Sequence, residues 1–309
     1  MAAVAGPNSR PGWFAVPAPV RELFKLFPLT TLPAELLPER APERTRPRPR
    51  LYVFARTEED ARSGRPSFNP QCLKWQTFLR IAGVEVDIVP SNNHASPSGA
   101  LPFLLPPTIT QSSSSTTESK SAPTPKSTLP LTGSKIERYA EDHSSHEIPT
   151  DSSHSRIEAY EALLSQSLRP AWLYTLYLDP FNTTLLTTLY LPASPILQLP
   201  SLHTLRSAAT AEILKTTRSA IISPLQLLSD ATDALRSLSA LLSADEWFFG
   251  RSEPGLFDAE VFAYTYLILD PEFGWADDSL AKCLAKFGNL VEHRRRLYER
   301  CWPESQGEK

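Results

Sequence analysis

The sequence predicts an α/β domain over residues 50–140, followed by an all-α domain over residues 156–302. Three patterns indicate this division. A strand, a helix and a second strand follow one another between residues 51 and 89, apolar residues recur at helical spacing from residue 156 onward, and a polar linker at 141–155 separates the halves. The length of 309 residues, with 41% hydrophobic and 21% charged side chains, suits two soluble domains of ordinary size.

The first domain begins with an apolar run, LYVF at 51–54, which we interpret as a strand. Pro70 then starts a helix, because proline lacks the N–H that would have no intrahelical partner at the first helical position. One face of this helix is apolar and is formed by Cys72, Trp75, Phe78, Leu79 and Ala82. Gly83 suits the left-handed residue that ends a helix, and residues 84–89 alternate apolar and acidic side chains as a half-buried strand does.

A third strand begins at Leu101-Pro102 within GALPFLL (99–105), and a further helix begins within GSKIERYA (133–140). Between them, residues 108–127 read TITQSSSSTTESKSAPTPKS. This stretch contains too little apolar surface to offset the entropy lost on ordering. We therefore expect a disordered insert at 108–127.

The second domain consists of predicted helices. Arg169-Pro170 should interrupt the first of them, because the residue before a proline disfavours helical geometry. Ser223-Pro224 supplies an N-cap and a first-turn proline to a later helix. Asp258 is expected to cap a buried helix by accepting hydrogen bonds from first-turn amides. The expected helical segments are residues 157–168, 172–177, 202–221, 224–242 and 289–302, and the segment 247–269 is expected to contain the buried helix that Asp258 caps.

The ends of the chain are expected to lie outside these domains, as a proline-rich extension at 1–49 and a tail at 303–309. Early prolines interrupt the apolar core that a secretory signal needs, and early arginines are too few for a mitochondrial presequence. Residues 20–27 (VRELFKLF) form a short amphipathic segment with Phe24 on its apolar side. This segment either packs on the protein's own surface or contacts a membrane or partner. No apolar run reaches the roughly 18 residues of a membrane-spanning helix.

The overall charge and the cysteines exclude several classes of protein. A formal net charge of −3 does not indicate a nucleic-acid partner. Cys72, Cys283 and Cys301 are odd in number and lack a CxxC pair, so we expect free thiols and no disulfide framework.

Two polar clusters invite a functional interpretation. His143, His146 and His154 lie in the linker among carboxylates, but a solvated linker explains them better than a metal site, and we expect no metal. The basic run at 293–296, which includes Arg294 and Arg295, is interpreted either as a solvated helix face or as a partner contact.

The first domain resembles a thioredoxin-type fold and, more narrowly, the N-terminal half of glutathione transferases; the second resembles their helical C-terminal half. NPQC at 69–72 stands where redox members of the superfamily have C-P-x-C and many transferases have S-P-x-C. The resemblance implies a cis peptide bond at Pro102 and a glutathione-contacting hydroxyl at Ser134, with Gly133 in place of an acidic residue. Asn69, Pro102 and Ser134 would then be vestigial glutathione-site positions.

This chain lacks the catalytic side chains that thiol redox enzymes and glutathione transferases need. A thiol redox enzyme needs an attacking thiolate at the helix end, where this chain has Asn69. A transferase needs a hydroxyl or thiol near the end of the first strand, where Ser67 is the only nearby hydroxyl and Tyr52 lies inside the strand. The sequence contains no catalytic cluster, phosphate loop or metal motif, so we expect a non-enzymatic protein without a cofactor.

Two further motifs make the chain similar to one family, the metaxins. The pattern N-x-x-C-L-x-x-x-x-x-L-x-x-x-G is matched by Asn69, Cys72, Leu73, Leu79 and Gly83. The closing pattern N-L-x-x-H/Y is matched by Asn289, Leu290 and His293. The resemblance covers most of residues 50–302 and is strongest to the smaller fungal members.

The metaxin resemblance implies a peripheral subunit of the sorting and assembly machinery (SAM complex) on the cytosolic face of the mitochondrial outer membrane. Its partners would be a membrane-embedded β-barrel assembly subunit, a second metaxin-like subunit and β-barrel precursor proteins. An active glutathione transferase and a transferase-like scaffold of another complex stay open as alternatives. The expected partner-binding residues are those of the vacated groove and its rim, Asn69, Asn92, Asn93 and Ser98, together with Phe24, Arg294 and Arg295.

Overall fold

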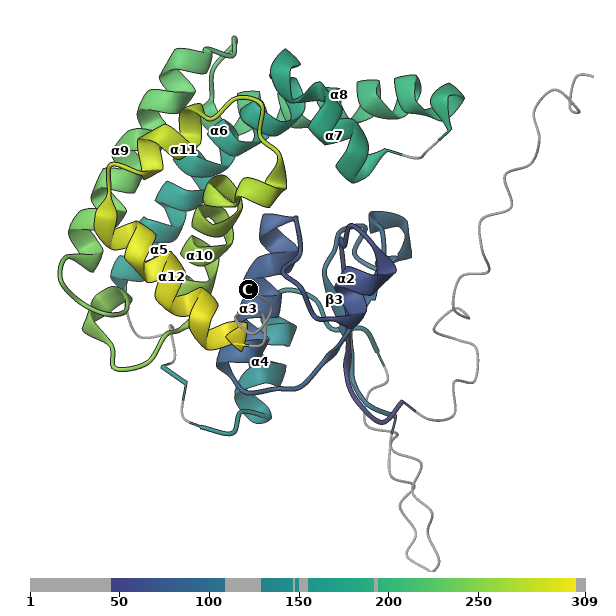
Figure 1. The fold of residues 1–309 in the computed structure, drawn as a ribbon, viewed down its shortest axis with the longest axis vertical. Helices are drawn as coiled ribbons and strands as arrows, with labels where there is room; N and C mark the ends of the chain where they lie inside the picture. The colour runs from purple at the N-terminus through teal and green to yellow at the C-terminus, as the bar shows by residue number, and fades with distance from the viewer. Residues whose placement is uncertain (1–45, 109–128, 147, 150–154, 192–193, 304–309) are drawn as a thin grey trace, which may run out of the picture. The chain divides into compact units, whose positions relative to one another are not determined.

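The computed structural model describes residues 46–108, 129–146, 148–149, 155–191 and 194–303. Residues Thr45–Lys309 form one compact unit (Figure 1), whereas the other unit, Met1–Arg44, lies outside the described residues. The expectations for Phe24, for the segment 20–27 and for the insert from residue 109 to 127 also fall outside them. The described chain runs from a small mixed sheet with helices into an all-helical part, which is the fold class that the sequence predicts.

Three strands form the sheet, in the order β2-β1-β3. They are β1 (Arg50–Val53), β2 (Asp87–Pro90) and β3 (Phe103–Leu105). Leu51 is the centre of the register, because it pairs with Ile88 of the parallel strand β2 and with Leu104 of the antiparallel strand β3. Leu51 and Leu104 have no exposed surface, so the middle of the sheet belongs to the core.

The second strand begins three residues later than the alternation of apolar and acidic residues predicts. Gly83, at φ +70°, and Val84 still belong to the end of the preceding helix, because their amides donate to the carbonyls of Arg80 and Leu79 at 3.1 and 3.0 Å. These bonds satisfy carbonyls that a helix end leaves without partners. The alternating pattern therefore covers a helix terminus as well as a strand.

A single residue, Leu131, pairs with the free edge of β3 as an isolated β-bridge. Leu131 pairs antiparallel with Leu104, with N–H···O distances of 2.9 and 2.8 Å between the two backbones. Thr108 also pairs in this way, because its amide donates to the carbonyl of Arg46 at 2.8 Å. The predicted insert therefore includes one residue, Thr108, that is held by the sheet end.

Helices α3 (Pro70–Ile81) and α4 (Ser134–Asp142) lie on the side of the sheet that faces the helical part (Figure 1). A short helix, α2 (Glu58–Arg62), interrupts the connection between β1 and α3. The predicted apolar face of α3 is buried, with Trp75 only 7% exposed. Because Gln76 and Thr77 are also buried, α3 is enclosed on most sides rather than on one.

The helical part follows with eight α-helices described and several short turns of other pitch. Residues Leu164–Leu168 and Tyr174–Leu178 form π-helical turns, and residues Pro180–Asn182 form a 3₁₀ turn. The helices after α5 (Ser155–Leu163) are α6 (Arg169–Leu173), α7 (Thr183–Tyr190), α8 (Pro195–Thr217), α9 (Pro224–Leu242), α10 (Leu256–Leu269), α11 (Ser279–Leu284) and α12 (Gly288–Cys301).

Two predicted helix boundaries were wrong. Pro170 does not end the first helix, which continues through it from Ser155 to Leu178. The π turn directly before α6 widens the helix at the place where a proline ring removes a backbone donor and crowds the preceding turn. The helix predicted at 202–221 instead runs over Pro195–Thr217 with Pro200 inside it, and the sequence did not predict α7.

Helix α10 joins the two parts of the fold, since it packs on α3, α11 and α12. An ion pair crosses this boundary, with Lys74 Nζ 2.6 Å from Glu260 Oε2 and both side chains 13% exposed. Trp302 Nε1 also donates to the carbonyl of Gly64 at 2.8 Å. These contacts fix the α/β part and the helical part as one body.

The described residues of the connection between the two parts are mostly exposed but contact the protein at several points. The hydroxyl of Ser144 donates to the carbonyl of Ala82 at 3.0 Å, and Ile148 is 9% exposed. The ring of His143 stacks on that of Tyr139, with centroids 4.1 Å apart. Ser144 therefore contacts the C-terminal end of α3, and His143 that of α4. Among the described residues, no helix is both long enough and apolar enough to cross a membrane.

Candidate functional site

Asn69 caps the N-terminus of α3, as an asparagine directly before a first-turn proline can do. Its Oδ1 accepts hydrogen bonds from the amides of Gln71 and Cys72 at 3.0 and 3.2 Å. Its Nδ2 donates to the hydroxyl of Tyr190 at 3.0 Å. Both ends of the Asn69 amide are therefore used by the protein itself.

Tyr190 reaches this helix end from α7 of the helical part, within a cluster of aromatic side chains. Its ring lies edge-on to those of Phe54 and Phe68, each with a centroid distance of 5.2 Å, and 5.6 Å from that of Tyr177. Burial raises the pKa of Tyr190 well above its usual value. The hydroxyl that meets Asn69 is consequently protonated at neutral pH and forms part of the packing between the two domains.

The other nucleophilic groups near this helix end are buried and occupied. Ser67 is 1% exposed, and its hydroxyl donates to the carbonyl of Phe54 at 2.6 Å and accepts from the amide of Asn69 at 3.3 Å. The thiol of Cys72 has no exposed surface, and burial raises its pKa to about 12. Ser67 thus fixes the loop before α3, and Cys72 stays a neutral thiol at physiological pH.

The other two vestigial positions are Pro102 and Ser134. Leu101-Pro102 is a cis peptide bond, as the resemblance implies, and the Leu101 amide donates to Asn93 Oδ1 at 3.0 Å. Ser134 is the exposed first residue of α4. Its neighbour Gly133 has φ +55°, a left-handed conformation that disfavours the acidic side chain seen at this position in transferases. No hydrogen bond in the described part of the chain joins Asn69 to Pro102 or Ser134.

The predicted rim residues occupy one exposed loop. Asn92 caps a short 3₁₀ turn by accepting from the amide of His94 at 2.9 Å. The hydroxyl of Ser98 donates to the carbonyl of Ala100 at 3.1 Å. Asn92, Asn93 and Ser98 are all exposed, so the structure places these three together and accessible. None of the structural observations assigns them a partner.

The basic run on α12 is not a solvated face as a whole, which corrects that interpretation. His293 has no exposed surface, and its Nε2 lies 3.0 Å from Asp258 Oδ1. Arg294 lies over the ring of Tyr266, with 5.0 Å from Cζ to the centroid. The sequence analysis missed this arrangement because the neighbours of His293 are arginines. The spacing of three and four residues to Leu290 and Leu297, which places His293 on their buried helix face, is the signal that could have revealed it.

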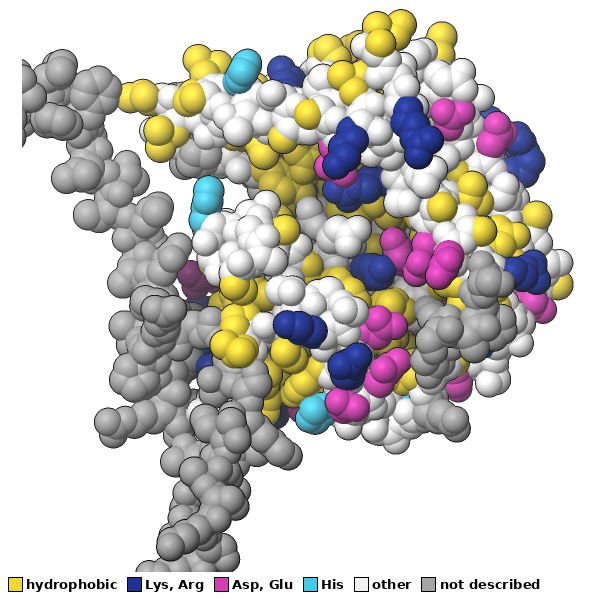
Figure 2. Space-filling view, turned by 180° about the vertical axis from the view of Figure 1, so that it is seen from behind, with side chains coloured by type: hydrophobic (Ala, Val, Ile, Leu, Met, Phe, Trp, Pro, Cys, Tyr) yellow, Lys and Arg dark blue, Asp and Glu magenta, His cyan; other side chains and the backbone are white. Residues whose placement is uncertain are grey.

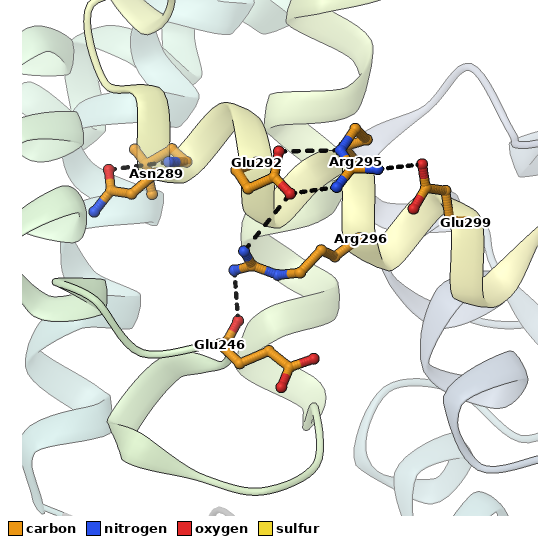
Figure 3. Close-up of polar contacts among 7 residues, drawn as sticks. Glu246, Asn289, Glu292, Arg295, Arg296 and Glu299 are labelled. Carbon is orange, nitrogen blue, oxygen red and sulfur yellow. Dashed lines mark hydrogen bonds and ion pairs between the residues drawn. The ribbon is translucent and has the colours of Figure 1, made fainter.

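Arg295 and Arg296, in contrast, form hydrogen bonds and ion pairs with residues near the surface (Figure 3). Arg295 Nε donates to Glu292 at 3.0 Å, and Arg295 Nη1 donates to Glu299 at 2.5 Å. Arg296 Nη2 donates to the carbonyl of Glu246 at 2.8 Å. Arg295 is thus exposed but already paired along its own helix, which lowers its value as a partner contact.

A pocket with a volume of about 250 Å³ lies within the helical part. Sequence reasoning missed it, because its walls come from three distant segments that share no motif. Among the described residues, no group of three or more His, Cys, Asp or Glu side chains could hold a metal ion. The pocket is lined by Ala171, Tyr174, Thr175, Asp179, Phe181, Pro224, Leu225, Leu227, Leu228, Asp277 and Ser279.

Comparison with known proteins identifies two matching domain families. Residues 70–182 match the model of a glutathione S-transferase N-terminal domain, and residues 231–297 match that of a glutathione S-transferase C-terminal domain. A search of curated protein sequences finds no match.

Two solved glutathione transferases and a solved β-etherase resemble the chain at low identity. The apo form of glutathione S-transferase III has 14% identity and a TM-score of 0.46, with 84% of this chain and 96% of that chain covered. A glutathione transferase from Pseudomonas putida, with one glutathione disulfide bound per subunit, has 12% identity and a TM-score of 0.45, with 92% and 95% covered. A β-etherase from Sphingobium sp. strain SYK-6 has 14% identity and a TM-score of 0.44, with 82% and 99% covered.

Proposed function

From a chain with glutathione-transferase-like N- and C-terminal domains, we propose a non-enzymatic function. The protein is a peripheral subunit of the sorting and assembly machinery on the cytosolic face of the mitochondrial outer membrane. It aids the recognition and insertion of β-barrel precursors together with a membrane-embedded β-barrel subunit and a second metaxin-like subunit. The observation that carries the non-enzymatic part is the bonding of Asn69, whose Oδ1 caps α3 and whose Nδ2 binds Tyr190.

The chemical argument concerns the thiolate that a glutathione transferase must stabilise. A free hydroxyl or thiol beside the end of α3 could donate to that sulfur. At this place the Asn69 side chain caps α3 and donates one N–H to Tyr190, the Ser67 hydroxyl donates to the carbonyl of Phe54, and the Cys72 thiol is buried. A glutathione sulfur would therefore meet neither a free hydroxyl nor an accessible thiol among these three side chains.

The metaxin-like motifs support the assembly complex rather than another scaffold. The Asn, Cys, Leu and Gly positions of the first motif all have structural roles in α3: Asn69 caps it, Cys72 and Leu79 are buried in it, and Gly83 ends it. The motif thus specifies a transferase-like helix whose N-terminus carries a cap in place of an activating residue.

The structure also offers surface for a hydrophobic partner. Residues 180–205 contain no Asp, Glu, Lys or Arg. Within them, Ile196, Leu197 and Leu199 at the start of α8 are 64%, 51% and 75% exposed, and Figure 2 shows hydrophobic side chains gathered on this projecting end. Apolar side chains presented together in this way are typical of protein or membrane contacts. This end of α8 supports attachment to an outer-membrane complex.

Affinity purification from solubilised mitochondrial outer membranes tests the proposal. We expect the tagged protein to be recovered with a β-barrel assembly subunit and a second metaxin-like subunit. Alkaline carbonate should remove it from the membrane. Recovery of the protein alone, or retention in the carbonate pellet, would contradict the proposal.

Crosslinking then locates the contact. Photo-reactive residues at Asn93 and Ser98 should capture the barrel subunit or its precursor if the rim loop is the interface, and one at Leu199 should do so if the end of α8 is. A probe at exposed Asp142 serves as a control on a different surface. Capture by the Asp142 probe alone would place the interface elsewhere.

A further inference from the structure

The pocket of the helical part is separate from the helix end at Asn69. Its walls come from the turns that follow α6, from the start of α9 and from the loop before α11. These helices lie on the side of the helical part away from the sheet (Figure 1). A volume of about 250 Å³ is smaller than the roughly 300–1,000 Å³ of small-molecule sites, and it suits one large side chain.

The rim of this pocket is apolar and unusually exposed. Phe181 is 75% exposed and Leu225 is 81% exposed, and both line the pocket. Ile221, close to Leu225 in the chain, is 75% exposed. Large apolar side chains at the mouth of a pocket can cover the apolar stem or neighbour of an inserted group.

Two carboxylates lie inside this apolar rim. Asp179 is 7% exposed, and its Oδ1 accepts from the amide of Phe181 at 3.0 Å. Asp277 is half-buried, and its Oδ1 accepts from the hydroxyl of Ser279 at 2.6 Å. Within the described residues, neither Asp179 nor Asp277 forms an ion pair with Lys or Arg, whereas neighbouring Asp278 is paired with Lys282 at 2.7 Å.

The two carboxylates and Tyr174 line the same pocket. Burial raises the pKa of Tyr174, and the negative charges of Asp179 and Asp277 raise it further. A carboxylate withdrawn from water without a cation is costly, and a bound cation offsets that cost.

We propose that this pocket binds a lysine or arginine side chain of a partner polypeptide, in which apolar residues flank the basic one. The cationic head lies between Asp179 and Asp277, and the aliphatic stem and the flanking residues pack on Phe181 and Leu225. The recognised partner is thus a basic and apolar peptide segment. This inference does not depend on the proposed function, because the pocket shares no residue with the Asn69 site.

The test compares two fluorescein-labelled peptides by anisotropy at physiological ionic strength. One is acetyl-Leu-Arg-Leu with the label at its C-terminus, and the other carries citrulline, a neutral isostere, in place of arginine. The arginine peptide should bind at least about tenfold more tightly, which corresponds to about 1.4 kcal/mol. Equal binding of the two peptides by the parent protein would overturn the proposal.

Variants separate the contributions of charge and apolar surface. Asp179→Asn with Asp277→Asn keeps the Oδ1 acceptors of Phe181 and Ser279, so it should fold, and it should bring the two peptides to equal affinity. Leu225→Ser should weaken both peptides. The matched controls are Asp142→Asn and Leu129→Ser, at an exposed carboxylate and at a leucine that is 67% exposed.

The outcomes have defined meanings. An unchanged preference for arginine in the double asparagine variant would overturn the assignment of the two carboxylates. Equal weakening in the control variants would show a diffuse surface effect and would also overturn it. If the double variant fails to fold, Asp277→Asn alone, which alters the more exposed carboxylate, should reduce the preference for arginine.

Discussion

Replacing Asp258 with alanine tests the structural role of the buried carboxylate between α10 and α12. Asp258 has no exposed surface and accepts three hydrogen bonds: from the amide of Gly255 at 2.9 Å, from the amide of Phe248 at 3.0 Å and from His293 Nε2 at 3.0 Å. The first of these closes the N-terminus of α10, and the other two join α10 to the preceding loop and to α12. Asp258→Ala leaves all three donors without their acceptor.

The magnitude follows from those donors. Each buried donor left unsatisfied costs about 1–3 kcal/mol, and breaking a buried charged contact typically costs about 3–5 kcal/mol. We therefore expect Asp258→Ala to lower the free energy of unfolding by roughly 3–5 kcal/mol. Asp258→Asn should cost less, because its Oδ1 can still accept from Phe248 and His293 while only the Gly255 amide loses its acceptor.

Urea unfolding followed by circular dichroism measures these differences as shifts of the midpoint at constant slope. Asp233→Ala is the matched control, since this exposed carboxylate is paired only with Arg236 on its own helix and should cost less than about 1 kcal/mol. A loss below about 1 kcal/mol for Asp258→Ala would refute the role of Asp258 as a buried cap. Equal losses for the alanine and asparagine variants would show that the negative charge and the bond to the Gly255 amide, which both variants remove, decide the cost.

Three further predictions concern the core and its ionisable groups. Trp75→Ala should lower the free energy of unfolding by about 3–5 kcal/mol because Trp75 is 7% exposed; calorimetric unfolding that matches Leu129→Ala, at a leucine 67% exposed, would contradict this. Since burial raises the pKa of Cys72 to about 12, a disulfide reagent at pH near 8 should modify it only after unfolding, and fast labelling lost in Cys72→Ala would disprove the burial. Burial also raises the pKa values of Tyr177 and Tyr190. The unfolded chain therefore releases these two protons at a lower pH than the folded protein does. The stability that the two protonated hydroxyls contribute is fully present below a pH of about 10 and is lost as the pH rises further. Urea midpoints between about pH 9 and pH 11 should therefore fall more steeply for the parent than for the variant with both tyrosines changed to phenylalanine.

Local rules predicted the elements that local interactions determine. Pro70 at the first turn and Asn69 before it fix the start of α3. Pro224 likewise starts α9 with Ser223 before it, although the Ser223 side chain makes no capping hydrogen bond. Asp258 lies three residues after Gly255, which is the spacing of a helix cap, and it does accept from that amide. In each of these cases the deciding contact spans only a few residues of sequence.

Other features depend on residues far apart in the chain. Asn69 and Tyr190 are 121 residues apart, so the closure of the helix end by α7 had no local signal. His293 was assigned to a solvated run because its neighbours are arginines, yet Asp258, 35 residues away, makes it part of the core. The passage of a helix through Pro170 needed a π turn whose geometry no propensity predicts.

The pocket with Asp179 and Asp277 could not be predicted for a related reason. Asp179 precedes Pro180 in a turn, and Asp277 lies in a polar loop, so each alone looks like ordinary turn chemistry. Only the packing of the α9 start together with those two segments creates the cavity that both carboxylates line. The sequence shows both carboxylates, but only the fold shows that they line the same pocket.

Titration calorimetry with reduced glutathione tests most directly the claim that Asn69 and Tyr190 have replaced the transferase site. We expect no saturable binding by the purified protein at glutathione concentrations up to about 10 mM, above the usual range of enzyme Michaelis constants. Binding with a dissociation constant below about 1 mM would contradict the account, most clearly if Asn69→Ala abolished it in a variant that still folds.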